Sequence, residues 1–388
     1  MERRQFIKAG GVGVAIALAG CTVEDTDDSN GTDGTDDTDE TTGTGDTDGA
    51  DTDDADSDGS ETTREDVDNE LTVATYSSFL DAPSISPGEW LKSEFESSFD
   101  AEITYQTPER EVSHFIEQRN AGGTVDADVY LGLNTDELVD VDEQLDEALF
   151  ESGLSVAGQE NVREGLDFDP EDRAVPFNTG YISLVYDSTE SEAPETFDGL
   201  LDDEHSGALI TQDPAQSTTG QAFLYHTIHH FGEDGYLDFW DELQDNDVRV
   251  LGSWGDAYAA WDEGEAPMVV SYSTDQVFAA DAGADLDEHQ IRFLNDQAYA
   301  NPEGVGIFTE AANPNLSREF IEFLLQPEIQ GEIAQRNVVF PATDNAELPE
   351  EYAQLAHEPP EPVTFTYEEL QGSHSEWIEE WERQFIGD

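Results

Sequence analysis

From residue 71 onward, the hydrophobic positions alternate between short β-type runs and runs with the helical repeat of three to four residues. The helix over 87–99 is the best marked, because Pro87 suits a first turn and large apolar side chains recur on one face. Up to residue 131, the pattern predicts strands over 71–75, 101–105 and 128–131 and helices over 87–99 and 111–120. Such alternation predicts βαβ units around a mixed sheet.

A second set of the same kind follows farther along the chain. It comprises strands over 181–186, 208–210, 248–250 and 267–272 and helices over 220–230 and 257–263. Roughly 320 residues is long for one α/β layer and typical of two lobes. We therefore predict an α/β fold with mixed sheets flanked by helices. Lobe 1 is expected to comprise residues 70–177 and 275–388, and lobe 2 residues 178–274, with the crossings near residues 177–181 and 272–275.

The first 21 residues have a different pattern, in which paired arginines precede a short apolar run and a cysteine. Arg3 and Arg4 match a twin-arginine export signal, and the apolar run over 9–18 is far shorter than the roughly 20 residues that span a bilayer. Cys21 is the only cysteine, which excludes disulfides and leaves its thiol for lipid attachment. We expect twin-arginine export and a lipid anchor that holds the protein at the extracellular face of the cell membrane.

Residues 22–69 are nearly all Asp, Thr, Gly, Ser and Glu, with no aromatic side chain. Such a segment cannot bury enough apolar surface to offset the entropy of ordering. It is predicted to be a disordered acidic linker.

The charge of the whole chain is strongly negative, with 92 acidic against 14 basic residues and a formal net charge of −78. Nucleic acid and anionic lipid would be repelled. Because concentrated salt would screen this self-repulsion, the composition indicates a halophilic host. The 20 Phe, 12 Tyr and 6 Trp still allow a substantial core.

No motif of a common catalytic class occurs: G-x-S-x-G, H-E-x-x-H and the Walker loop are all absent. His226, His229 and His230 share a predicted helix with apolar neighbours, which favours packing over metal binding. We therefore expect no enzyme, no cofactor and no metal. A secreted hydrolase that uses carboxylates alone stays open as an alternative.

Candidate binding residues lie where predicted strands end. Ser217 and Thr218 open a helix and could hold a phosphate or carboxylate at its positive end, or simply cap it. Trp254 stands among small residues at another turn, where an exposed indole face suits a flat cationic ring. A third strand ends in an aromatic, two hydroxyls and an acid: Tyr272, Ser273, Thr274 and Asp275.

These segments, in this order, resemble the thiamine-binding periplasmic proteins of bacterial thiamine ABC importers, here as a haloarchaeal-type lipoprotein. The matching segments are 71–76, 127–133, 176–181, 185–187, 212–214, 217–218, 254, 257–258, 271–274 and 377–381. The resemblance implies a two-lobed type II periplasmic-binding-protein fold with a hinged cleft. It also implies a ligand, thiamine or one of its phosphates, and as partners an ABC permease with its ATPase. We expect a monomer.

The resemblance also assigns roles. Trp254 and Tyr272 would stack on the two rings of the ligand, with Tyr76 as a further wall. The remaining polar contacts would come from Ser217 and Thr218 at the phosphate and from Ser273, Thr274 and Asp275. Ferric iron or another small solute is the alternative cargo, although iron sites commonly use adjacent tyrosines and no Tyr-Tyr pair occurs.

The chain departs from the family at two places. Arg110 and Glu111 replace an Asp-Gly pair that touches the phosphate end of the ligand, so Arg110 would either pair with a phosphate or pair locally with Glu111 or Ser113. Val338 replaces a Trp that closes over the ligand, which removes one wall.

Overall fold

The computed structural model of the chain describes residues 69–80 and 86–385. The chain divides into two units, residues 1–61 and 62–388, and the described residues belong to the second. The predicted export signal, the lipidation of Cys21 and most of the predicted acidic linker lie outside the described residues.

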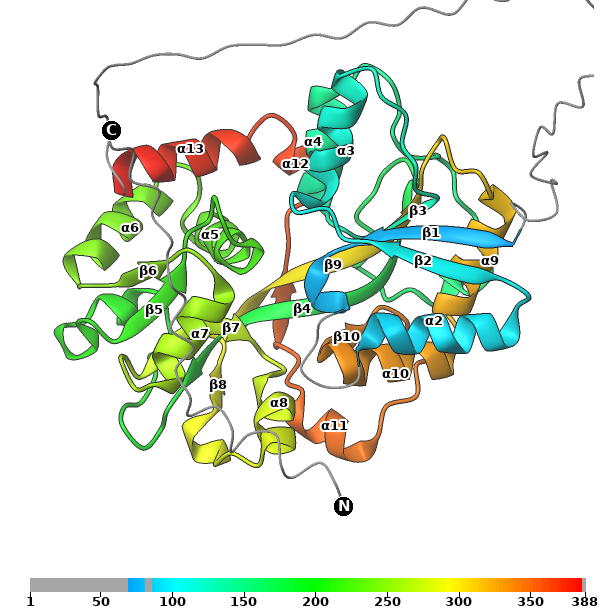
Figure 1. The fold of residues 1–388 in the computed structure, drawn as a ribbon. Coiled ribbons are helices and arrows are strands. Elements are labelled where there is room, and N and C mark those ends of the chain that lie inside the picture. Colours follow the sequence, from blue (N-terminus) through cyan, green and yellow to red (C-terminus); the bar gives the residue numbers. More distant parts are fainter. Residues whose placement is uncertain (1–68, 81–85, 386–388) are drawn as a thin grey trace, which may run out of the picture. The chain divides into compact units, whose positions relative to one another are not determined.

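An eleven-stranded mixed sheet runs through the described residues, in the order β2-β1-β3-β9-β4-β7-β5-β6, with β8 and β10 paired to β4 and β11 paired to β9. The strands are β1 (Glu70–Thr75), β2 (Glu102–Gln106), β3 (Val129–Leu133), β4 (Ala174–Tyr186), β5 (Leu209–Gln212), β6 (Arg249–Leu251), β7 (Met268–Tyr272), β8 (Gln290–Arg292), β9 (Gln297–Ile307), β10 (Phe340–Pro341) and β11 (Glu361–Val363). Figure 1 shows β4 and β9 running between the two halves of this sheet.

Strand β4 belongs to both halves. Its residues 174–181 pair antiparallel with β9, whereas residues 182–186 pair with β7 and β8. The change of partner falls beside Tyr181, close to the expected first crossing between lobes. Parallel pairs continue outward on each side, from β1 to β2 and β3 and from β5 to β6 and β7.

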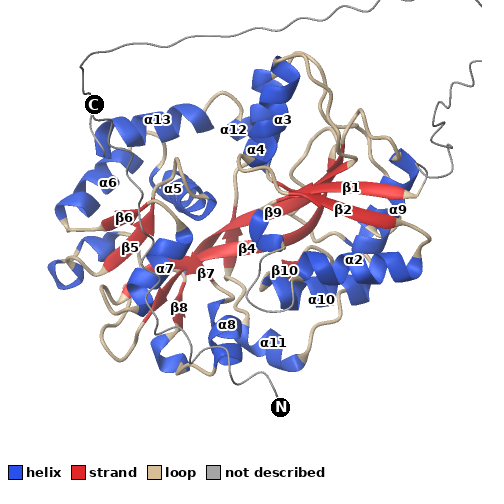
Figure 2. Cartoon of the chain, in the orientation of Figure 1, coloured by secondary structure: helices blue, strands red, loops and turns tan. Residues whose placement is uncertain are grey.

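Helices cover both faces of the sheet (Figure 2). They are α2 (Pro87–Ser98), α3 (Glu111–Asn120), α4 (Thr135–Gln144), α5 (Thr218–Phe231), α6 (Tyr236–Asp245), α7 (Trp254–Asp262), α8 (Asp275–Ala282), α9 (Pro314–Leu324), α10 (Pro327–Asn337), α11 (Glu350–Leu355), α12 (Tyr367–Leu370) and α13 (His374–Phe385). Each strand and helix predicted up to residue 272 is present, but α4 and α6 were not predicted and β4 begins at Ala174 rather than at residue 181.

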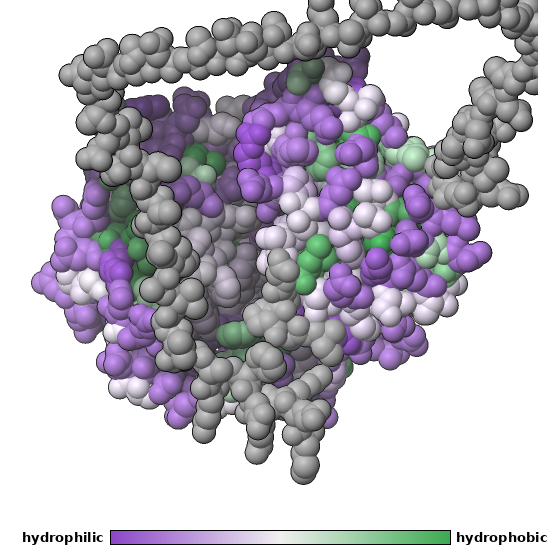
Figure 3. Space-filling view, viewed as in Figure 1, coloured by the Kyte–Doolittle hydropathy of each residue, from purple (hydrophilic) through white to green (hydrophobic). Residues whose placement is uncertain are grey.

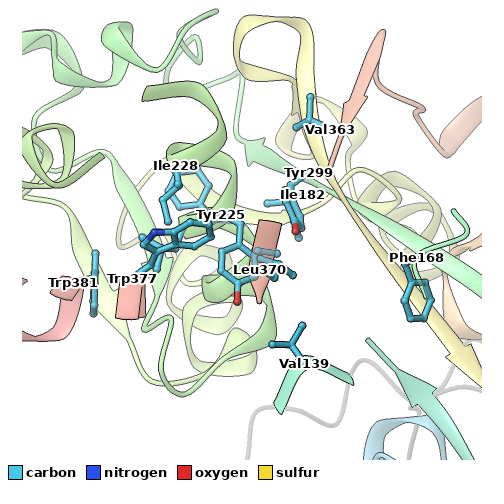
Figure 4. Packing of buried hydrophobic residues seen from close by; sticks show 14 of the residues in the cluster. Val139, Phe168, Ile182, Tyr225, Ile228, Tyr299, Val363, Leu370, Trp377 and Trp381 are labelled. Carbon is cyan, nitrogen blue, oxygen red and sulfur yellow. The ribbon is translucent and has the colours of Figure 1, made fainter. Parts of the chain in front are cut away.

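Large apolar side chains hold these layers together. On one side, Leu91 and Phe95 of α2 pack with Phe320 of α9 in a fully buried cluster. A second cluster joins α3 and α4 to α5, α6 and α13, and Figure 4 shows Tyr225 and Ile228 of α5 close to the indole of Trp377. Burying side chains of this size stabilises the fold by roughly 1.5–3 kcal/mol each.

Helix α13 packs against α6 of the second half of the sheet, whereas the predicted boundaries assign it to lobe 1. Trp377 and Trp381 are buried, as expected for core residues, and Trp381 packs edge-on against Trp240 of α6, with 5.3 Å between ring centroids. Strand β8 likewise pairs with the second half of β4. Both segments were expected in lobe 1 from chain order, but side-chain packing and strand pairing join them to elements of the second half.

Hydrophilic residues cover most of the face seen in Figure 3. Among the described residues, no helix combines the length and the apolar character that a bilayer crossing requires.

Val338 ends α10 in the left-handed region, with φ 55° and ψ 48°. A β-branched residue is strained there, whereas glycine is not. We expect Val338→Gly to raise the free energy of unfolding by about 0.5–1 kcal/mol, measured by denaturant unfolding in molar KCl. Gln335→Gly, inside the same helix, is the control and should lower it by about 1 kcal/mol. Equal losses in the two variants would contradict the strain argument.

Candidate functional site

Two tyrosine rings lie beside the central strands because glycines make room for them. Tyr76 follows β1 and lies over Gly132 of β3, where an added Cβ would come within 2.7 Å of the ring. Tyr272 ends β7 and lies over Gly180 of β4, where the corresponding distance is 2.8 Å. Both rings stand at carboxyl ends of strands, the edge where α/β sheets bind ligands.

A hydrogen-bond network joins Tyr76 to the long central strands. The Tyr76 hydroxyl donates to Glu303 Oε2 of β9 at 3.0 Å, and Asn178 Nδ2 of β4 donates to the same oxygen at 2.7 Å. Asn337 Nδ2 at the end of α10 donates to the Tyr76 hydroxyl at 2.9 Å. Glu303, Asn178 and Asn337 were missed by sequence reasoning.

On the other side, Tyr272 is held from α5. The Thr219 hydroxyl donates to the Tyr272 hydroxyl at 3.2 Å. Thr219 is buried and Thr218 is exposed, so the residue that contacts this tyrosine is one position beyond the predicted pair.

The carboxylates near this network have raised pKa values. Burial raises the pKa of Glu303 to about 7; hydrogen bonds from Asn178 and Tyr76 act against this shift, and the negative charge of Glu111 adds to it. Burial, followed by the charges of Glu111 and Asp136, holds the pKa of Glu137 well above its usual range. In the described part of the chain, no ion pair involves any of these four acids. The site therefore holds several desolvated carboxyl groups whose raised pKa values reduce their negative charge near neutral pH.

Trp254 presents its ring at the first turn of α7. Its side chain is 39% exposed, as the sequence predicts. The indole Nε1 donates to the Ser271 hydroxyl at 3.0 Å, and Tyr258 packs against the ring with 5.0 Å between centroids. Ser253 caps the helix by accepting from Asp256 N at 3.1 Å. One edge of the indole is thus anchored while part of the ring remains open to a ligand.

Ser217 caps α5. Its side-chain oxygen accepts from Gly220 N at 3.4 Å, which is the capping alternative stated above. Its side chain is partly exposed and that of Thr218 is exposed, so both hydroxyls lie near the surface at a helix N-terminus. Phosphate binding by Ser217 and Thr218 stays a prediction.

The polar residues after β7 are turned into the protein. Asp275 accepts from the Tyr258 hydroxyl at 2.6 Å and pairs with His289 Nδ1 at 2.8 Å, so both of its oxygens have partners. Thr274 donates its hydroxyl to the Val338 carbonyl at 2.8 Å. Ser273 is fully buried, and its hydroxyl has no hydrogen-bond partner among the described residues. Ligand contact by these three side chains stays a prediction.

Arg110 is exposed and forms an ion pair with Glu117, rather than with Glu111 or Ser113. This ion pair does not test whether Arg110 binds a phosphate, because an exposed pair is weak and can exchange partners. Glu111 begins α3 with φ 46°, a backbone conformation that glycine adopts more readily.

Of the three histidines of α5, His226 is buried in the core, His230 is partly exposed and His229 is exposed. His226 is buried edge-on against Phe197, with 4.8 Å between ring centroids. Burial, with His229 and His230 nearby, lowers the pKa of His226 to about 3, which keeps it neutral. Across residues 69–80 and 86–385, no group of three or more His, Cys, Asp or Glu side chains could hold a metal ion.

Known proteins with the same arrangement are solute receptors. The family model described as bacterial extracellular solute-binding protein matches residues 90–360. The thiamine-binding periplasmic protein of Escherichia coli strain K12 is 29% identical over 314 residues, which cover 81% of this chain and 92% of that protein. The corresponding protein of Brucella abortus is 28% identical over 325 residues, covering 81% and 91%.

Solved structures agree with these sequence matches. A periplasmic thiamin binding protein superimposes with a TM-score of 0.70 at 28% identity, over 81% of this chain and 96% of that one. The apo ferric ion-binding protein A of Pasteurella haemolytica reaches a TM-score of 0.68 at 16% identity, over 82% and 99%, which shows a shared fold alone. The expected type II periplasmic-binding-protein fold is thereby confirmed.

Proposed function

Because the chain belongs to the bacterial extracellular solute-binding protein family, we propose that it binds thiamine or a thiamine phosphate and delivers it to an ABC importer. The main observation in support of the proposal is the indole of Trp254, which is partly exposed and is held by the hydrogen bond from its Nε1 to Ser271. A desolvated cation over an aromatic face gains about 2 kcal/mol or more, and thiamine carries a permanently charged ring. The thiamine-binding names of the relatives support the same cargo.

Tyr76 and Tyr272 would add further ring contacts, and Ser217, Thr218 and Arg110 would meet a phosphate where the ligand carries one. The two lobes would close on the ligand, which strengthens each polar contact by excluding water. The receptor binds and releases its ligand without turnover and uses no cofactor.

The proposed setting follows from the sequence. Cys21 carries the lipid anchor after twin-arginine export, and the acidic linker holds the folded part away from the membrane. The receptor acts as a monomer beside its permease and ATPase. The charge of −78 supports a halophilic host, so binding is to be measured in molar salt.

Calorimetric and Trp-fluorescence titration of the full chain in molar KCl tests the cargo. Thiamine should bind at one site per chain and change the Trp emission, and comparison with thiamine mono- and diphosphate defines the preferred form. Ferric citrate is the comparison cargo and should give no saturable signal. An absence of thiamine binding at millimolar concentration would overturn the proposal.

A further inference from the structure

We infer that Glu303 supplies the counter-charge for the ligand, and that its carboxylate forms a subsite for a heteroaromatic cation with the rings of Tyr76 and Tyr272. This inference rests on the proposed function and names the residue that selects for positive charge. No sequence pattern singles out this glutamate among the acids of the chain.

The geometry leaves one carboxylate oxygen available. Glu303 of β9 lies directly opposite Asn178 of β4 in the strand register. Both hydrogen bonds that reach Glu303 end on Oε2, from Tyr76 and from Asn178. In the described part of the chain, no hydrogen bond involves Oε1. The donors thus fix the orientation of the carboxylate without neutralising its charge.

Asn178 gives a second, independent sign of a ligand. Its side chain is 1% exposed, and its amide nitrogen is used on Glu303. The amide oxygen Oδ1 is buried and has no partner among the described residues. A buried acceptor left unpaired costs about 1–3 kcal/mol. A ligand N–H group between Oδ1 and the carboxylate would recover this energy.

Among residues 69–80 and 86–385, no Lys, Arg or His forms an ion pair with Glu303. Arg110 pairs with Glu117, and Arg336 pairs with Glu332 and stacks on Trp90 at 4.8 Å. The titratable groups that influence Glu303, or are influenced by it, are Tyr76, Glu111, Tyr130, Glu137 and Tyr272. All of them are acids or phenols. A positive charge that pairs with Glu303 would therefore come from the ligand.

The test compares the wild type with Glu303→Gln, which keeps an acceptor for Tyr76 and Asn178 but removes the charge. Thiamine affinity is measured between pH 6 and 8.5 in molar KCl. The pKa of about 7 for the free carboxyl means that the charged form dominates only above neutrality. Wild-type affinity should therefore rise severalfold as the pH increases through 7 and then level off. Glu303→Gln should bind about tenfold more weakly at pH 8 and lose the pH dependence.

Two further variants keep the result interpretable. Glu310→Gln removes a glutamate just beyond β9 that pairs with Arg119 at 2.7 Å, and it should keep the wild-type pH profile. Glu303→Asp retains the charge and should keep a pH-dependent affinity. If Glu303→Gln does not fold, the wild-type profile decides, because a flat profile overturns the inference.

The outcomes separate this inference from the proposed function. If the wild type does not bind thiamine, the proposed function fails. If the wild type binds thiamine and Glu303→Gln binds it equally well with the same pH profile, only the counter-charge role of Glu303 fails.

Discussion

Replacement of Trp254 by alanine is expected to weaken thiamine binding about 30-fold. The loss corresponds to about 2 kcal/mol, the gain from a desolvated cation over an indole face. Trp254 is 39% exposed but bonds Ser271 and packs against Tyr258, so its removal should also lower the free energy of unfolding, and the folded state of the variant is checked before affinity is compared. Affinity is measured by calorimetry in molar KCl, because the substitution also removes a fluorescent reporter.

Trp90→Ala is the matched control. This indole is partly buried on α2 under the guanidinium of Arg336, 4.8 Å from the ring centroid, and among the described residues it forms no hydrogen bond or ring contact with Tyr76, Tyr272 or Trp254. Its removal should lower stability and leave the affinity as it is. Trp254→Phe should fall between the wild type and Trp254→Ala. Equal affinities of Trp254→Ala and the wild type would rule out stacking on Trp254.

Periodicity predicted most of the elements up to residue 272, because their buried faces carry large apolar side chains at regular spacing, but it missed α4, α6 and the first half of β4. Strand β9 escaped this reasoning. Its sequence from Gln297 to Ile307 contains Asn, Pro, Glu and two Gly, which are depleted in strands. Pairing with β3 on one side and β4 on the other overrides that propensity. Missing β9 also meant missing Glu303.

For the candidate site, the sequence predicted the exposure of Trp254 but did not predict the hydrogen-bond partners of Asp275. Trp254 is exposed as predicted, because small neighbours at a strand-to-helix turn leave part of its ring uncovered. Asp275 instead has both oxygens engaged by Tyr258 and His289. Those partners lie 17 and 14 positions away, and no local pattern shows them.

The network around Tyr76 was hidden for a related reason. Its contacts to Glu303 and Asn337 join residues 227 and 261 positions apart in the chain. In a chain with 92 acidic residues, a single functional glutamate carries no compositional signal. The strand register, which aligns Asn178 with Glu303, is what identifies it.

The largest expected loss of stability follows replacement of Arg173 by methionine. Arg173 is 4% exposed just before β4, and its guanidinium bonds Asp169 Oδ1 at 2.9 Å and Asp142 Oδ2 at 2.6 Å. Asp169 is also 4% exposed. Methionine would fill a similar volume but leave the Asp169 carboxylate buried without a cation. We expect the free energy of unfolding to fall by about 3–5 kcal/mol, measured by denaturant unfolding in molar KCl.

The control for Arg173→Met is Arg249→Met. Arg249 pairs with Glu265 at 2.5 Å, but the two side chains are 38% and 46% exposed, so its loss should cost under about 1 kcal/mol. Adding Asp169→Asn to Arg173→Met removes the stranded charge and should recover part of the lost stability, which a double-mutant cycle measures. If Arg173→Met costs no more than Arg249→Met, neither the stranded Asp169 carboxylate nor the loss of the guanidinium over the Tyr367 ring, 5.6 Å away, contributes much to stability.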